Sequence, residues 1–130
     1  MLNTPSRALR HELQELLLVA VGAVPGALCR WQLGVHLADK DLIANVVGAL
    51  VLGLLAGLPA RPRRQLLVGI GFCGSLTTFS SWMVNCVAMI AMGQWLSAFG
   101  LLGLTLGFGV GGAALGFGVG RALRPHTPPI

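Results

Sequence analysis

Charge is scarce in this chain. Only 10% of its 130 residues are charged, the acidic residues number four, and tyrosine is absent. A soluble domain carries about a quarter charged residues, so a soluble globular protein is excluded. The 55% hydrophobic content and the 19 glycines instead indicate an integral membrane protein, and residues 1–130 form one domain of it.

Groups that could perform chemistry are also few. The cysteines, Cys29, Cys73 and Cys86, are odd in number, lie in apolar surroundings and have no metal-ligand spacing. We interpret them as small apolar fillers. No nucleophile–base pair, metal-ligand cluster or phosphate loop is evident, so no enzyme is predicted. The net charge of +5 comes from cations at segment ends rather than from a patch, which argues against nucleic-acid binding.

Four apolar stretches remain once the charged residues are marked. They cover about residues 13–33, 42–58, 66–92 and 95–120. About 20 residues suffice to cross a bilayer as a helix, so the sequence predicts an all-α membrane protein with four spans. Arg30 and Trp31 fall at the end of the first stretch, where we expect an interfacial anchor pair.

The third stretch is too long for a simple span. Its 27 uncharged residues would reach about 40 Å as a helix, against about 30 Å of hydrocarbon. Its middle holds Gly71, Gly74 and several hydroxyl residues, so we expect a break between Gly74 and Thr78. Irregular backbone at that depth survives only when it is buried in protein or lines a wet path. The alternative is a kinked helix whose hydroxyls bond back to the preceding turn.

Other polar groups inside the spans are rare. Asn45 must face other helices or water, either joining helices or directing its amide donor at an anion. Thr105 is the only hydroxyl in the middle of the fourth stretch. Two series of glycines there are spaced by four and predict faces where helix backbones touch, namely Gly103, Gly107 and Gly111, and Gly112, Gly116 and Gly120.

Positive charge is distributed unevenly between the two sides of a four-span chain. One side holds seven arginines, and the other holds Arg30 and Lys40. Cytoplasmic loops carry the excess of positive charge, so both termini are predicted to be cytoplasmic. The seven are Arg7, Arg10, Arg61, Arg63, Arg64, Arg121 and Arg124.

The string from Gly71 to Trp82, GFCGSLTTFSSW, resembles the third-helix signature of the small fluoride channels called CrcB or Fluc. Residues 22–31 and 45–53 resemble the motifs of that family's first two helices. The resemblance implies a four-span subunit with a third helix broken at mid-membrane, working as an antiparallel dimer. It also implies passive fluoride export, and thus fluoride resistance, across a bacterial inner membrane.

The same resemblance assigns roles to individual residues. The carbonyls of Gly74 and Thr77 would hold a structural Na⁺ at the dimer centre, together with those of the second subunit. The fluoride path would be lined by Asn45, Phe79, Ser80, Ser81 and Trp82. Asn85 and Thr105 would be polar groups of a gate or vestibule.

The chain departs from the family pattern at several of these positions. Ser75 replaces a glycine, Trp82 stands where a second phenylalanine is usual, and Asn85 stands where many members have glutamate. Family members that pair with themselves need balanced charge, which this chain lacks. A specialised subunit paired with an oppositely inserted paralogue is therefore an alternative to the homodimer.

Two other functions are compatible with four short spans. A proton-coupled multidrug exporter needs an intramembrane carboxylate, for which Glu15 is the candidate, although it lies near a membrane end. A purely structural membrane subunit would need only the glycine faces.

Overall fold

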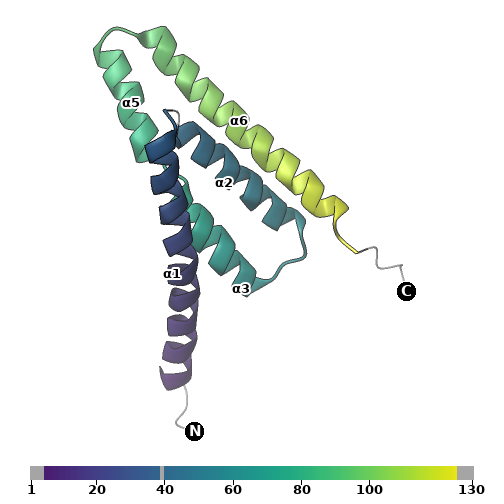
Figure 1. Ribbon diagram of the computed structural model, residues 1–130. Coiled ribbons are helices and arrows are strands. Elements are labelled where there is room, and N and C mark those ends of the chain that lie inside the picture. The colour runs from purple at the N-terminus through teal and green to yellow at the C-terminus, as the bar shows by residue number, and fades with distance from the viewer. Residues whose placement is uncertain (1–4, 39, 126–130) are drawn as a thin grey trace.

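The computed structural model describes residues 5–38 and 40–125, and every regular element in these ranges is a helix. The long helices are α1 (Pro5–His36), α2 (Lys40–Gly57) and α6 (Trp95–Ala122). The segment between α2 and α6 contains α3 (Pro62–Arg64), η1 (Gln65–Cys73), α4 (Gly74–Leu76) and α5 (Ser80–Ala91). Four spans of sufficient length and apolarity result, so the predicted all-α, four-helix class is confirmed (Figure 1).

The third span is assembled from several pieces. Pro62 starts it, as suits a residue that lacks a backbone N–H. Its first half, η1, is a wide π-helix of nine residues, and π-helices of any length are rare in proteins. The helix then ends after Leu76 and resumes at Ser80. Gly93, with φ of 75°, makes the turn into α6.

Helices α2 and α6 lie side by side and run in the same direction (Figure 1). Glycines close the seam between them. A Cβ added at Gly53 would collide with the carbonyl of Ala113, and one added at Gly116 would collide with the carbonyl of Leu50. Such contacts require a residue without a side chain, because only then can two helix backbones touch.

Only one of the two predicted glycine faces of α6 is used inside the chain. Gly112, Gly116 and Gly120 face α2, whereas nothing lies within 4 Å of a Cβ placed at Gly103, Gly107 or Gly111. The second face is therefore open in the single chain.

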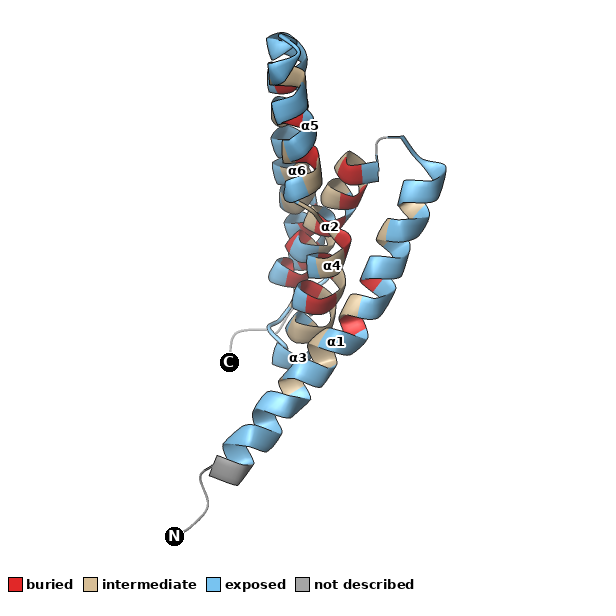
Figure 2. Cartoon of the chain, turned by 90° about the vertical axis from the view of Figure 1, so that its left-hand side faces the viewer, coloured by how far each residue is buried: buried red, intermediate tan, exposed pale blue. Residues whose placement is uncertain are grey.

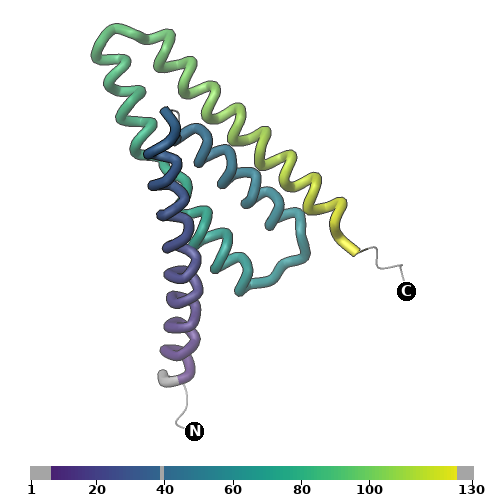
Figure 3. The backbone as a smooth tube through the Cα atoms, in the orientation of Figure 1, coloured from purple at the N-terminus to yellow at the C-terminus, as the bar shows by residue number. Residues whose placement is uncertain are grey.

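Helix α1 packs mainly on η1 and diverges from the other helices at its N-terminal end (Figure 3). Gly22 and Gly26 approach the carbonyls of Leu67 and Phe72, and Gly71 approaches that of Val19. These contacts fix α1 against the half of the third span that precedes the interruption.

Buried residues are most frequent on α2 and η1, while most of α1 and α6 is exposed (Figure 2). The exposed residues include many large apolar side chains, such as Leu16 on α1 and Leu96 on α6. A soluble protein seldom exposes contiguous apolar surface of this kind, whereas lipid would cover it.

Candidate functional site

The third span leaves helical conformation at Thr77–Phe79. Thr77 has φ −77° and ψ 158°, which is extended backbone. The interruption lies slightly beyond the stretch predicted from the sequence, because Gly74 is still helical, with φ −63° and ψ −33°. Its depth in a bilayer stays a prediction.

Asn45 of α2 holds the interruption. Its Nδ2 donates to the carbonyl of Thr78 at 2.8 Å, and its Oδ1 accepts from the N–H of Thr78 at 2.7 Å. In an unbroken helix that N–H would donate to the carbonyl of Gly74. One amide side chain thus replaces the helical partners that Thr78 has lost.

Arg30 of α1 reaches the same place from the other side. Its Nη1 donates to the carbonyl of Thr77 at 3.1 Å, and its Nη2 donates to the hydroxyl of Ser81 at 3.0 Å. Nη2 also lies 3.4 Å from Oδ1 of Asp41, which makes an ion pair with a long hydrogen bond. The guanidinium therefore joins α1, α2 and both sides of the interruption. Its expected role as an interfacial anchor stays a prediction.

The hydroxyls of the stretch divide into two groups. Ser75 and Thr77 donate to the carbonyls of Gly71 and Cys73, both at 2.9 Å, as the kinked-helix alternative expected. Thr78 instead lies beside Ser81 across the interruption, with 3.5 Å between their oxygens. Back-bonding and interruption therefore occur together, one after the other along the chain.

Phe79 and Trp82 form an aromatic pair at the start of α5. Their ring centroids are 5.4 Å apart and their planes meet at 82°, an edge-to-face arrangement. Phe79 is 69% exposed in the single chain, whereas Trp82 is 5% exposed. The two rings predicted to share a path thus differ in access, and Phe79 alone presents its ring outward.

A polar cavity of about 410 Å³ opens beside the interruption. It is lined by Lys40, Asp41, Ser80, Ser81, Val84 and Asn85. Three of these, Ser80, Ser81 and Asn85, were predicted from the sequence, and the structure brings them together. Hydroxyl and ammonium donors there face one carboxylate, and the carboxylate is paired with Arg30.

Sequence reasoning missed Asp41 and Lys40. The second span was predicted to begin at about residue 42, after both of them, but α2 begins at Lys40, and Asp41 is only 9% exposed. A carboxylate that precedes an apolar run by one residue is equally typical of a loop and of a first helical turn. The ion pair with Arg30 of α1, which is seen only in the structure, identifies Asp41 as a residue of the first helical turn that faces the protein.

Two predicted residues lie apart from this network. Thr105 on α6 is buried, and within the described ranges its hydroxyl has no hydrogen-bond partner. A Cβ placed at Gly74 would meet no other part of the described chain within 4 Å. In the described part of the chain no three His, Cys, Asp or Glu side chains could hold a metal together.

Comparison with known proteins places the chain in a family. Residues 17–117 match the model of the family described as CrcB-like protein, Camphor Resistance (CrcB). The chain belongs to the CrcB family. The matched region contains every site residue discussed above, from Arg30 to Thr105. With its four apolar helices, this CrcB protein is a multi-pass membrane protein.

Relatives of this CrcB chain carry channel names. "Fluoride-specific ion channel FluC 2" of Synechococcus sp. (strain CC9902) is 71% identical over 101 residues, covering 78% of this chain and 75% of the relative. The protein with the same name from Parasynechococcus marenigrum (strain WH8102) is 68% identical over 121 residues, covering 93% and 92%. "Fluoride-specific ion channel FluC 1" of Prochlorococcus marinus (strain NATL2A) is 38% identical over 99 residues, covering 69% and 82%.

Proposed function

We propose that the chain is a subunit of a fluoride-selective channel that lets cytoplasmic fluoride leave the cell down its electrochemical gradient. The observation that carries the proposal is the interruption at Thr77–Phe79, held by Asn45 and flanked by an outward-facing phenylalanine. The relatives named as fluoride channels, which match up to 93% of this chain, support it. Catalysis is no part of it.

The charges at the interruption suit a small, tightly hydrated anion. A pore for fluoride must replace water with hydrogen-bond donors and the positive edges of rings, without a free cation that would trap the ion. The charge of Arg30 is offset by Asp41 and shared with Thr77 and Ser81. Lys40, at the polar cavity, attracts anions toward the mouth of the path. The hydroxyls of Ser80 and Ser81 and the ring edge of Phe79 then contact the ion along the path. Trp82 packs against Phe79. Asn85 and Thr105 are polar groups at the outer part of the path.

A sodium ion is proposed as a structural cofactor at the interruption. Thr78 donates its N–H to Asn45, so the carbonyl of Gly74 lacks its usual helical donor. The carbonyl of Thr77 accepts from Arg30 and has a second lone pair. Oxygen ligands of this kind suit a hard cation. The carbonyls of Gly74 and Thr77 would share Na⁺ with those of a second subunit.

A second chain is proposed to cover the exposed features. Phe79 and the open face of Gly103, Gly107 and Gly111 lie outward in the single chain, which supports an antiparallel dimer. The partner is a copy of this chain or an oppositely inserted paralogue. The seven-to-two bias in positively charged residues, and the greater identity to relatives numbered 2 than to one numbered 1, favour the paralogue. We place the dimer in a bacterial inner membrane, with both termini of this chain cytoplasmic.

Co-expression tests the choice of partner. The tagged chain, expressed alone and together with a relative numbered 1 from the same cell, is purified and reconstituted. Efflux only from the mixed preparation supports the pair. Efflux from the chain alone supports the homodimer and shows that a paralogue is not required as partner.

Fluoride efflux from liposomes tests the channel itself. The conducting dimer is expected to release fluoride from the liposomes much faster than chloride. This release should not depend on a proton gradient. A requirement for a proton gradient would indicate an exporter instead, and no flux from either preparation would indicate a structural subunit. Proton independence is expected because Asp41 is held in an ion pair with Arg30, and Glu15 lies 3.2 Å from His11 in the part of α1 that precedes its apolar run.

A further inference from the structure

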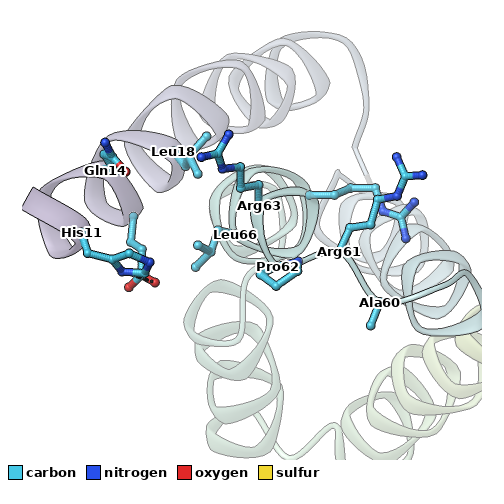
Figure 4. Close-up of a pocket in the computed structure, with 10 residues that line it drawn as sticks. His11, Gln14, Leu18, Ala60, Arg61, Pro62, Arg63 and Leu66 are labelled. Atoms are coloured by element: carbon cyan, nitrogen blue, oxygen red, sulfur yellow. Dashed lines mark ion pairs between the residues drawn. The ribbon is translucent and has the colours of Figure 1, made fainter. Parts of the chain in front are cut away.

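Basic side chains line cavities in two separate regions of the described chain, and the two regions are arranged differently. Beside the N-terminal part of α1, Arg61 and Arg63 line a cavity of about 680 Å³ but extend to opposite sides of α3 (Figure 4). Arg64 of that region donates to the carbonyl of Pro59. At the interruption, by contrast, the guanidinium of Arg30 bonds to α2 and to both sides of the third span. Positive charge is therefore held at a defined point only in the second region.

The hydrogen bonds of Arg30 are unequal in length. Nη1 donates to the carbonyl of Thr77 at 3.1 Å, and Nη2 donates to the hydroxyl of Ser81 at 3.0 Å. The bond from Nη2 to Oδ1 of Asp41 is 3.4 Å long, whereas a strong bond between guanidinium and carboxylate measures about 2.7–2.9 Å. Among the described residues, the carboxylate joins this pair through Oδ1 alone. Asp41 is thus the partner of Arg30 that another anion can replace most easily.

The Arg30–Asp41 pair is accessible from the polar cavity beside the interruption. The Arg30 side chain is 27% exposed and that of Asp41 is 12% exposed. Asp41 lines the cavity together with Ser81, the hydroxyl that Arg30 already binds. An anion that enters the cavity therefore arrives next to both the carboxylate and Nη2.

Lys40 adds a second cation to the same region. A Cβ placed at Gly34 of α1 would lie 3.3 Å from Cδ of Lys40, so the lysine side chain of α2 packs against α1. Lys40 lines one cavity with Arg30 and another with Asp41, each of about 410 Å³. Two cations and one carboxylate give the region a net charge of +1, and removal of the carboxylate would raise it to +2. A pore that binds its ion too strongly releases it slowly, so the carboxylate favours release.

We propose that Asp41 is a tethered competitor of fluoride for Arg30, an inference that rests on the fluoride path proposed above. Between ions the carboxylate occupies Nη2. Fluoride entering from the cavity displaces it, and the carboxylate returns to Nη2 as the ion moves on. Asp41 is a positioning residue that acts through Arg30. Its charge lowers the affinity of the site for fluoride and raises the rate at which each ion leaves.

The dependence of efflux on fluoride concentration tests this proposal in the preparation that conducts. In Asp41→Asn, the half-saturating fluoride concentration and the maximal rate should both fall about tenfold, an order of magnitude for removing one opposite charge from a part-exposed cation. Structural damage at Arg30 would instead raise the half-saturating concentration. An unchanged or raised value in Asp41→Asn therefore overturns the proposal.

Matched variants separate the carboxylate of Asp41 from net charge and from shape. Asp41→Glu keeps the charge and should retain the wild-type concentration dependence. Glu12→Gln removes the same charge from an exposed position of α1 and should change neither the half-saturating concentration nor the rate. An equal fall in the Glu12 variant would indicate only net charge and would overturn the competitor. Asp41→Ser, which also suits the start of a helix, replaces Asp41→Asn if the latter does not fold.

An equilibrium titration separates this proposal from the channel function. Potassium fluoride replaces potassium isethionate at constant sodium, and the unfolding midpoint of the protein in detergent reports binding. If the wild-type chain conducts but Asp41→Asn binds fluoride no more tightly, the channel stands and the competitor is overturned. If no preparation conducts, the proposed function fails, and the titration still decides. Tighter binding by Asp41→Asn then supports competition for Arg30, and equal or weaker binding overturns it.

Discussion

The side chain of Asn45 binds both the N–H and the carbonyl of Thr78, 33 residues away along the chain. It occupies the partners that a continuous helix would supply to Thr78. The amide of Asn45 therefore stabilises the non-helical backbone of the third span at Thr78.

Replacing Asn45 by alanine should destabilise the chain. Two part-buried hydrogen bonds would be lost, at about 0.5–1.5 kcal/mol each, and Thr78 would be left unsatisfied. We expect a lower midpoint of thermal unfolding in detergent and a loss of fluoride efflux. Gln32→Ala removes an exposed amide from α1 and should change neither. Wild-type stability and flux in the Asn45 variant would contradict the role of the amide.

Gly48→Ala should displace Thr77. A Cβ at Gly48 would overlap the Cγ2 methyl of Thr77, whose carbonyl accepts from Arg30. We expect reduced stability and flux, and partial rescue by Thr77→Ser, which removes the methyl but keeps the hydroxyl bonded to Cys73. Gly109→Ala, with nothing within 4 Å of the new Cβ, is the control. Equal behaviour of the single and double variants would show that this contact is not the cause.

Phe79→Ile should abolish efflux without loss of assembly. The substitution keeps an apolar side chain at an exposed position but removes the ring edge offered to the anion. Efflux and the elution volume of the reconstituted protein are measured together. Phe108→Ile, at an exposed position on α6, should conduct normally. Unchanged flux through the Phe79 variant would exclude its ring from the path.

Removal of sodium should lower stability. If the carbonyls of Gly74 and Thr77 hold Na⁺, exchange for N-methylglucamine at constant ionic strength removes a ligand of the folded state. Saturation at a hundredfold excess over the dissociation constant would contribute about 2.7 kcal/mol, enough to shift the unfolding midpoint by a few degrees. Identical midpoints in the two salts would argue against a resident ion.

The sequence predicted the number and order of the long helices because their apolar length leaves few alternatives. The excess length and hydroxyl content of residues 66–92 also indicated where helical structure is weak. The ion pair between Arg30 and Asp41 could not be predicted, since it depends on the tight α1–α2 hairpin bringing two apparently separate segment ends together. The two glycine series of α6 have the same spacing, so only the packing of α2 shows which one is used inside the chain.

The glycine seam between α2 and α6 limits how the molecule can be altered. Backbone atoms meet there directly, as at Gly53 and Gly116, so no choice of side chain can move these two helices closer together. Any enlargement from glycine pushes them apart and carries Asn45 with α2. If the proposed fluoride path runs beside the interruption, its width would be adjusted from the side of α1 and α5, with the α2–α6 pair as a fixed wall.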